Sequence, residues 1–447
     1  MAKGISGTRP EQQRGASELG ERLRTLRVSA GLTQSQLADG RFSKEYVSQI
    51  ERGKTRPSAE TVEWLAARLE ADPAYLLGGV SAEDRGRVEA ALARAEALTE
   101  QGEHAQAARA FADGRQAVSA TGASDLELRS LLGETWALAQ SGGVQEALRL
   151  LNRARDLAEH PEFSDVDRAS VLFRLGVCRY HLSSISTAVS LLSSALELAD
   201  RSGLPCDLLR GDILDWRSRC YRRQRDWQAA REDVERALEL AESARDRRAS
   251  ARAYFQASLV AEREGHWLLA RTYAERARGH FEELQDRANV GRLLNNLGGL
   301  NFTLGNPERA VELLTSAYDV ALETGDEPEA GLAMCSLAQV HLDRSEAALA
   351  EGEAARALAL FGNRPDYLQG IGTAQLVLGR ALLELDRLDE AEEILLAADK
   401  SFEQLSSVSH RAAAWVAQGD LAQKRNADRE AARLYRRAAE ALQDFRF

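Results

Sequence analysis

The sequence of 447 residues is too long for one compact core, so at least two domains are expected. A hydrophobic content of 44% with 28% charged residues excludes a disordered chain, and the net charge of −11 argues against a protein that coats nucleic acid along its whole length. Residues 1–80 contain 12 Lys and Arg against 10 Asp and Glu, a charge of +2, which leaves −13 for residues 81–447. Only the N-terminal segment is therefore expected to approach a polyanion closely.

The first residues are polar and lack the apolar run of a signal peptide, so residues 1–17 are predicted to be a flexible tail. No apolar stretch is long enough to span a bilayer, and we expect a cytoplasmic, nucleoid-associated protein without membrane contact. Alanine, leucine, glutamate and arginine dominate, while only 8 prolines occur, which favours helices. The predicted fold class is all-α.

Residues 18–79 are predicted to form a domain of five helices. Apolar residues at helical spacing indicate a first helix over residues 18–30. Thr33 and Gln36 have the form of a capping box before a second helix over residues 34–38, and Ser43 is the expected N-cap of a third helix that runs to Arg52. Two more helices are expected to start after Pro57-Ser58 and at Asp72-Pro73. Two short, capped helices joined by a tight turn predict a helix-turn-helix, whose second helix enters the major groove of DNA.

The third helix and its flanks resemble the phage-repressor-type helix-turn-helix of the Xre/Cro family. The resemblance rests on Leu32-Thr33-Gln34, on Val47-Ser48-Gln49-Ile50-Glu51-Arg52-Gly53-Lys54 and on Arg56-Pro57-Ser58. The turn at residues 39–42 is one residue shorter than the commonest spacing of that family. A protein–protein module built on the same helices is the alternative.

The resemblance implies a set of DNA contacts on these helices and on the loop that follows them. Base edges would be met by the exposed face of the recognition helix, at Lys44, Glu45, Tyr46, Ser48 and Gln49. Phosphates would be held at the start of the second helix and in the loop, by Gln34, Arg52, Lys54, Thr55 and Arg56. The two N-caps, Thr33 and Ser43, complete the predicted DNA-binding set. Arg27 and Glu51 match a structural ion pair of the family.

Residues 83–447 contain a ladder of small residues at intervals of 40 to 42 positions. Its rungs are Ala107, Ala147, Ala188, Ala230, Ala270, Ala310, Ala350, Ala391 and Ala431. A second small residue follows each rung by seven positions, and a third precedes it by twelve. A step of seven keeps two residues on one face of a helix, and small side chains there allow helices to approach closely. The ladder predicts nine helical hairpins stacked in an α-solenoid.

These hairpins resemble tetratricopeptide repeats, although their period exceeds the usual 34 and implies longer helices or looser connections. In that family the first helix of each hairpin lines a concave face. Large polar or aromatic side chains cluster at such positions in the third to sixth hairpins, and they form the predicted ligand-binding set: Arg174, Trp216, Arg219, Arg252, Gln256, Arg292, Asn295 and Asn296. Amide side chains can pair with an extended peptide backbone and arginine can clamp a carboxylate. A solvated inner face or salt bridges between hairpins is the alternative.

The order of the two domains is similar to that of the peptide-responsive quorum-sensing regulators (the Rgg, NprR, PlcR and PrgX group). The resemblance implies a homodimeric transcription regulator that binds an operator in double-stranded DNA and a short signalling peptide in its repeats. A DNA-tethered scaffold that recruits a protein partner is the competing hypothesis. The seven histidines show no metal-ligand spacing and no catalytic motif occurs, so neither an enzyme nor a cofactor is expected.

Overall fold

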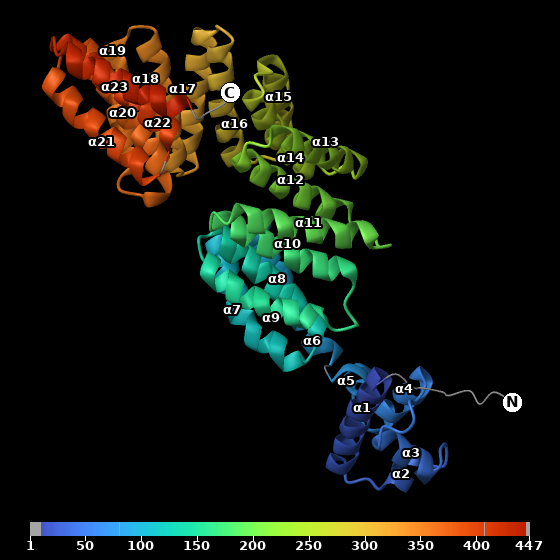
Figure 1. Cartoon of the computed structure of the whole chain (residues 1–447). Helices are drawn as coiled ribbons and strands as arrows, with labels where there is room; N and C mark the ends of the chain where they lie inside the picture. The colour runs from blue at the N-terminus through green and yellow to red at the C-terminus, as the bar shows by residue number, and fades with distance from the viewer. Residues whose placement is uncertain (1–9, 80, 406, 444–447) are drawn as a thin grey trace. The chain divides into compact units, whose positions relative to one another are not determined.

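The computed structural model describes residues 10–79, 81–405 and 407–443 (Figure 1). These residues form 23 α-helices and one short 3-10 turn, and none of them lies in a β-strand. The predicted all-α class is confirmed. The chain divides into two compact units, residues 1–205 and residues 206–447, which are described separately. No helix within the described ranges combines the length and the apolar character needed to cross a membrane.

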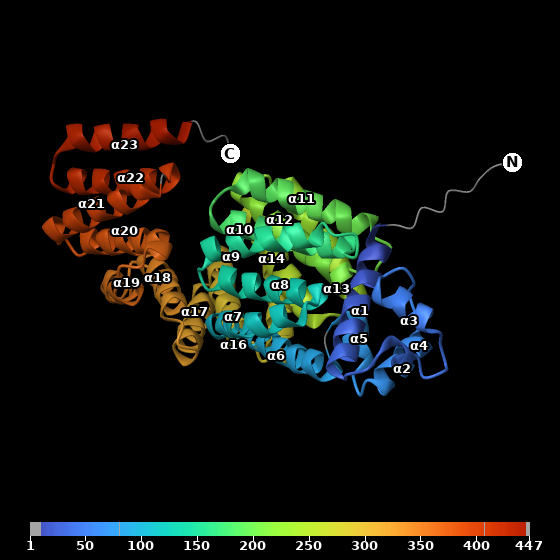
Figure 2. The same ribbon diagram turned by 90° about the horizontal axis from the view of Figure 1, so that it is seen from below.

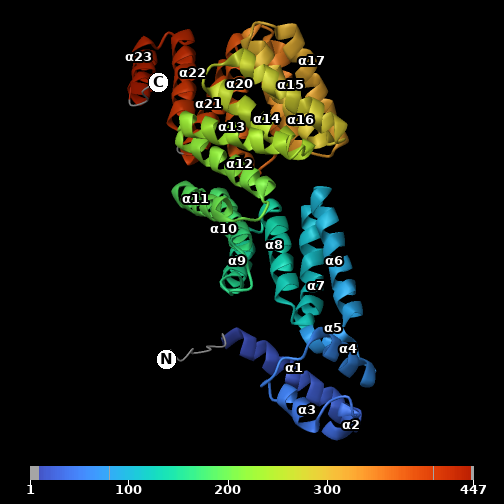
Figure 3. The same ribbon diagram turned by 90° about the vertical axis from the view of Figure 1, so that its right-hand side faces the viewer.

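The first unit begins with a five-helix head. Its helices are α1 Pro10–Ser29, α2 Gln34–Ala38, α3 Lys44–Glu51, α4 Ala59–Arg68 and α5 Pro73–Gly78. Both α1 and α2 pack against α3 (Figure 3). The core of the head consists of aliphatic side chains from all five helices, including Leu19, Leu23, Leu37, Ile50, Leu65 and Leu76.

The predicted start of the first helix is wrong. The helix α1 begins at Pro10 and not at residue 18, so residues 10–17 belong to a helix and not to a flexible tail. The reason is that polar residues can extend a helix by a few turns without adding to its apolar face, so periodicity does not detect them. The remainder of the predicted tail, residues 1–9, lies outside the described residues.

Nine helical hairpins follow the head, three in the first unit and six in the second. The first three are α6 Ala82–Glu100 with α7 His104–Thr121, α8 Ser124–Gln140 with α9 Val144–Ala158, and α10 Asp165–His181 with α11 Ile185–Arg201. The next three are α12 Asp207–Gln224 with α13 Trp227–Ser243, α14 Arg247–Arg263 with α15 Trp267–Glu283, and α16 Arg287–Thr303 with α17 Pro307–Glu323. The last three are α18 Glu327–Asp343 with α19 Ala347–Phe361, α20 Leu368–Glu384 with α21 Leu388–Gln404, and α22 Val408–Lys424 with α23 Asp428–Gln443. A 3-10 turn, Pro365–Tyr367, precedes α20, and α20 to α23 stack as successive neighbours (Figure 2).

The helices are longer than a period of 34 would allow. Both α16 and α17 have 17 residues, and the turns after them, residues 304–306 and 324–326, have three residues each, which together give the period of 40. The middle residue of each turn has a positive φ, 80° at Gly305 and 71° at Gly325. A left-handed residue at this position ends one helix and reverses the chain into the next. Longer helices, and not looser connections, therefore explain the spacing.

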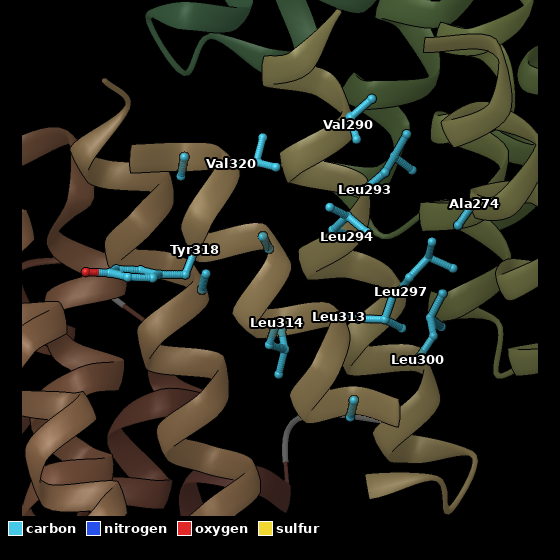
Figure 4. Close-up of a cluster of buried hydrophobic side chains, with 14 of the residues drawn as sticks. Ala274, Val290, Leu293, Leu294, Leu297, Leu300, Leu313, Leu314, Tyr318 and Val320 are labelled. Atoms are coloured by element: carbon cyan, nitrogen blue, oxygen red, sulfur yellow. The ribbon is translucent and has the colours of Figure 1, made fainter. Parts of the chain in front are cut away.

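The ladder of small residues lies at the contacts between helices. All nine rungs are buried, and eight of them have no exposed surface. In the hairpin of α16 and α17, a Cβ atom added to Gly298 would stand 2.5 Å from Leu314 Cγ, so the two helices approach as closely as glycine permits. Leucines on both sides of this contact, among them Leu297 and Leu313, form a continuous core (Figure 4).

The neighbouring glycines Gly298 and Gly299 provide a matched test of this close approach. We expect Gly298→Ala to lower the free energy of unfolding by about 1–3 kcal/mol, because the added methyl group overpacks the contact with Leu314. No described atom outside its own helix lies within 4 Å of a Cβ at Gly299, so Gly299→Ala is expected to stabilise the helix by about 0.5–1 kcal/mol. Urea denaturation of the two variants measures the difference. Equal shifts would show that Gly298 is not at a tight contact.

Candidate nucleic-acid interface and repeat groove

The two short helices of the head have the N-caps that the sequence predicts. Thr33 Oγ1 accepts a hydrogen bond from the backbone N–H of Gln36, whose side chain accepts from the backbone N–H of Thr33, so the capping box is complete. Ser43 Oγ accepts from the backbone N–H of Tyr46 at 3.1 Å. Because the caps satisfy the first N–H groups, the start of α3 is held in an exposed position.

A buried polar network fixes the angle between α1, α2 and α3. Arg27 donates to both carboxylate oxygens of Glu51, from Nε at 2.6 Å and from Nη2 at 3.2 Å, and its Nη1 donates to the carbonyl oxygen of Leu32 at 2.7 Å. Glu51 Oε2 also accepts a hydrogen bond from Gln34 Nε2 at 2.7 Å. The predicted ion pair is present. Gln34 remains half-exposed, and its amide nitrogen carries a second proton that is free to meet a phosphate.

The predicted base-reading residues of α3 differ in exposure. Lys44, Glu45 and Gln49 are exposed, while Tyr46 and Ser48 are half-buried. Gln49 Oε1 accepts a hydrogen bond from Thr55 Oγ1 at 3.1 Å, so a residue of the loop positions the amide of the recognition helix. The ring of Tyr46 lies 5.4 Å from that of Phe42, so part of this side chain belongs to the packing of the head.

Four cations of the predicted set lie on or beside α3: Lys44, Arg52, Lys54 and Arg56. All four are exposed, and none forms an ion pair with a carboxylate in the described part of the chain. Elsewhere in the head Arg22, Arg27, Arg41 and Arg68 each pair with a carboxylate. Four of the five described cations of the head that form no ion pair therefore lie on or beside the recognition helix, where phosphates would lie, and the fifth, Arg24, lies on α1.

The short turn before α3 is held by an aromatic contact that the sequence does not reveal. The ring of Trp64 on α4 meets that of Phe42 edge-on, with centroids 5.2 Å apart, and the guanidinium of Arg41 lies 5.7 Å from the Trp64 ring. Helical position alone would leave Trp64 facing solvent. Contact with Phe42 explains how a turn one residue shorter than usual still positions α3.

The structure distributes the predicted ligand-binding residues over several places. Arg174 lies in the first unit, where its Nε donates to the carbonyl oxygen of Leu132 at 2.8 Å and it borders a cavity of about 840 Å³.

The other predicted ligand-binding residues lie in the second unit. Arg219 lies over the ring of the buried Trp216 at 4.6 Å and pairs with Asp215. Arg252 pairs with Asp212 at 2.5 Å, and the buried Gln256 accepts from Arg222 at 3.1 Å. The eight residues therefore do not form one cluster.

A groove of about 1300 Å³ in the second unit contains three of the predicted residues: Arg292, Asn295 and Asn296. Its lining comes from α12, α13, α14, α16 and α18 and, in the same unit, from α22 and α23. The first helices of four successive hairpins thus share one groove, as the resemblance to tetratricopeptide repeats predicts.

Neighbouring hairpins engage two of these three residues. Arg292 Nε donates to Glu329 Oε1 at 3.1 Å, and Asn296 Nδ2 donates to Glu262 Oε2 at 3.1 Å. Burial raises the pKa of Glu329, although Arg292 acts in the opposite direction. The oxygen Oδ1 of Asn295 is buried and has no hydrogen-bond partner in the described structure. The alternative prediction, salt bridges between hairpins, accounts for Arg252 and Arg292. It does not account for Asn295, whose Oδ1 remains without a hydrogen-bond partner.

The sequence analysis predicted only three of the groove residues, and those that it missed include Arg263 at the end of α14 and His410 near the start of α22. Burial and the positive charge of Arg263 both lower the pKa of His410 below its ordinary value. The imidazole Nδ1 shares a hydrogen bond with Ser407 Oγ at 2.7 Å and the ring stacks on Phe402. Because Arg263 and His410 are far apart in the sequence, only the structure shows that both line the same groove.

Among the described residues, no group of three or more acidic, histidine or cysteine side chains is arranged to hold a metal ion.

Comparison with known proteins supports both parts of this architecture. Residues 18–76 match the family model described as a helix-turn-helix domain. A search of curated proteins found no significant sequence match. The chain is therefore a helix-turn-helix domain followed by a helical-repeat domain.

Solved structures show the repeat fold. The chain is similar to a Rap protein complexed with competence and sporulation factor, at 16% identity over 80% of this chain and 98% of that chain, with a TM-score of 0.55. It is also similar to the apo form of the quorum sensor NprR from B. thuringiensis, at 12% identity over 80% of this chain and 99% of that chain, with a TM-score of 0.60. A signal transduction ATPase with a tetratricopeptide repeat sensor from Pyrococcus horikoshii is 14% identical over 98% of this chain and 64% of that chain, with a TM-score of 0.60. At these identities the likeness establishes a shared fold.

Proposed function

We propose that the protein is a sequence-specific, DNA-binding transcription regulator whose repeat domain binds a short peptide. The observation that carries the DNA-binding part is the concentration of unpaired cations around the exposed, capped helix α3, next to the polar side chains of Ser48 and Gln49. Phosphate contacts would fix the position of the head on the duplex, and the side chains of α3 would read base edges in the major groove.

The groove of the second unit supports the peptide-binding part. Its volume of about 1300 Å³ exceeds the range of roughly 300–1000 Å³ that is typical of small-molecule sites. The similar Rap protein was solved in complex with competence and sporulation factor. A short extended peptide would suit a groove of this size with amide and guanidinium groups in its lining.

The proposed regulator acts in the cytoplasm as a homodimer, with two heads on one operator. Dimeric helix-turn-helix proteins bind half-sites about 34–36 Å apart, which is one turn of the duplex. A peptide in the repeats would then regulate DNA binding by changing the spacing of the two heads. Sedimentation of the purified full chain with and without an operator duplex measures whether a dimer binds.

Salt dependence tests the proposed phosphate contacts directly. We expect the affinity of the full chain for genomic duplex DNA to fall steeply with salt concentration, because each phosphate contact releases counterions. Lys54→Ala is expected to flatten the plot of log affinity against log salt by about 0.9, which is the slope that one neutralised phosphate contributes. Arg309→Ala removes the same charge from an exposed position of α17 and is expected to leave the slope unchanged. Equal slopes for the wild type and Lys54→Ala would place Lys54 outside the interface.

A further inference from the structure

The groove of the second unit is basic within an acidic domain. Its lining contains five arginines and two glutamates, namely Arg222, Arg223, Arg225, Arg263, Arg292, Glu262 and Glu329. Residues 81–447 as a whole carry a charge of −13. Like charges that converge on one concave surface raise the local potential and attract an oppositely charged ligand. The surrounding negative charge would repel a long polyanion such as DNA, so a small anionic ligand fits the groove better.

One of these arginines, Arg263, is engaged by no carboxylate of the described structure. Arg292 pairs with Glu329 and Asp326, whereas Arg263 forms no ion pair with any described residue. Arg263 lies on α14, opposite Ser409 and His410 of α22, so the two walls of the groove offer a guanidinium, a hydroxyl and an imidazole to the same space. A carboxylate there would accept charge-assisted hydrogen bonds from Arg263.

The same groove has an apolar part and a free acceptor. Trp227, Phe255, Leu259 and Leu442 contribute aromatic and aliphatic surface to the lining. The buried oxygen Oδ1 of Asn295 has no hydrogen-bond partner in the described structure. An unpaired buried acceptor is unfavourable in the free protein, and a small movement of the Asn295 side chain would bring it within reach of the backbone N–H of a bound peptide.

We infer that the ligand of this groove is an acidic peptide, with a side-chain carboxylate bound to Arg263 and an apolar side chain against Phe255 and Leu259. The inference rests on the proposed peptide-binding function and adds the charge of the ligand and the residue that selects it. Recognition would combine one charged contact, which gives specificity, with apolar burial, which gives affinity.

A selection experiment tests the charge of the ligand. The immobilised full chain is incubated with a pool of short random-sequence peptides, acetylated and amidated at their ends so that all charge comes from side chains. We expect the retained peptides to be enriched in Asp and Glu and to carry an apolar residue. Retention of basic peptides, or no preference for charge, would overturn the inference and leave peptide binding intact. Retention of no peptide at all would overturn both, whereas the proposed DNA binding is tested separately by its salt dependence.

A substitution tests the role of Arg263. Arg263→Gln is expected to weaken binding of the most enriched acidic peptide by about tenfold or more, the effect that follows from removing one charge-assisted hydrogen bond. Arg309→Gln, at an exposed position of α17 outside the groove lining, is expected to leave the affinity unchanged. Arg263 is exposed and unpaired, and Arg309 forms only an exposed ion pair with Glu312, so both variants should melt at the temperature of the wild type. Equal affinity of Arg263→Gln and the wild type would overturn the assignment.

Discussion

Replacement of Arg27 by alanine is expected to lower the free energy of unfolding of the head by about 3 kcal/mol or more. Arg27 is bidentate with Glu51, and their side chains are only 12% and 4% exposed. Its removal leaves the Glu51 carboxylate buried without a counterion, and the hydrogen bond from Gln34 Nε2 is the contact of the network that remains. A buried charge without its counterion costs far more than the removal of an exposed pair.

Hydrogen exchange of the amides of α3, followed by mass spectrometry, measures this effect locally. We expect these amides to exchange about a hundredfold faster or more in Arg27→Ala than in the wild type, since each 1.4 kcal/mol corresponds to a factor of about ten. Arg68→Ala is the control, because Arg68 and its partner Asp39 are both exposed and such a pair contributes about 1 kcal/mol or less. An effect of Arg27→Ala as small as that of Arg68→Ala would show that the network does not hold α3 in place.

The double charge reversal Lys44→Glu, Lys54→Glu is expected to weaken DNA binding by about two orders of magnitude or more at moderate salt, because the phosphate contact of Lys54 becomes repulsive and an anion replaces the cation of Lys44 on the helix face that meets the duplex. Both side chains are exposed and neither pairs with a described carboxylate, so the head should remain folded. Band-shift titrations give the affinity and thermal melting gives the stability.

The control for this variant is Arg429→Glu, Arg433→Glu, which makes the same change of net charge at two exposed positions of α23. If both double variants bound DNA equally weakly, net charge and not the position of α3 would determine DNA binding. If Lys44→Glu, Lys54→Glu bound as tightly as the wild type, DNA would have to contact another face of the head.

The parts of the structure that follow from local chemistry could be predicted from the sequence. The capping residues Thr33 and Ser43 mark the starts of α2 and α3, since a side-chain oxygen before a helix satisfies N–H groups that nothing else can reach. The ladder of small residues predicts all nine hairpins, because close helix contacts exclude larger side chains at those positions. Residues 10–17 were missed because their helix adds no apolar periodicity.

The groove depends on contacts between distant parts of the chain, and there the prediction was incomplete. The predicted ligand-binding residues were chosen at equivalent positions of successive hairpins. Each hairpin is rotated relative to the one before it, so side chains at equivalent positions do not all face the same groove. The carboxylates that engage Arg252 and Arg292 come from neighbouring hairpins, which a comparison of single repeats does not reveal. Arg263 and His410 meet across the groove only because α14 and α22 line it together.

The most direct test of the account is selection of genomic DNA fragments by the purified full chain at low ionic strength. We predict that the wild type retains a small set of fragments that share a sequence element, and that Lys44→Glu, Lys54→Glu retains none of them. Recovery of no fragment above the level of that variant would contradict the claim that α3 reads duplex DNA.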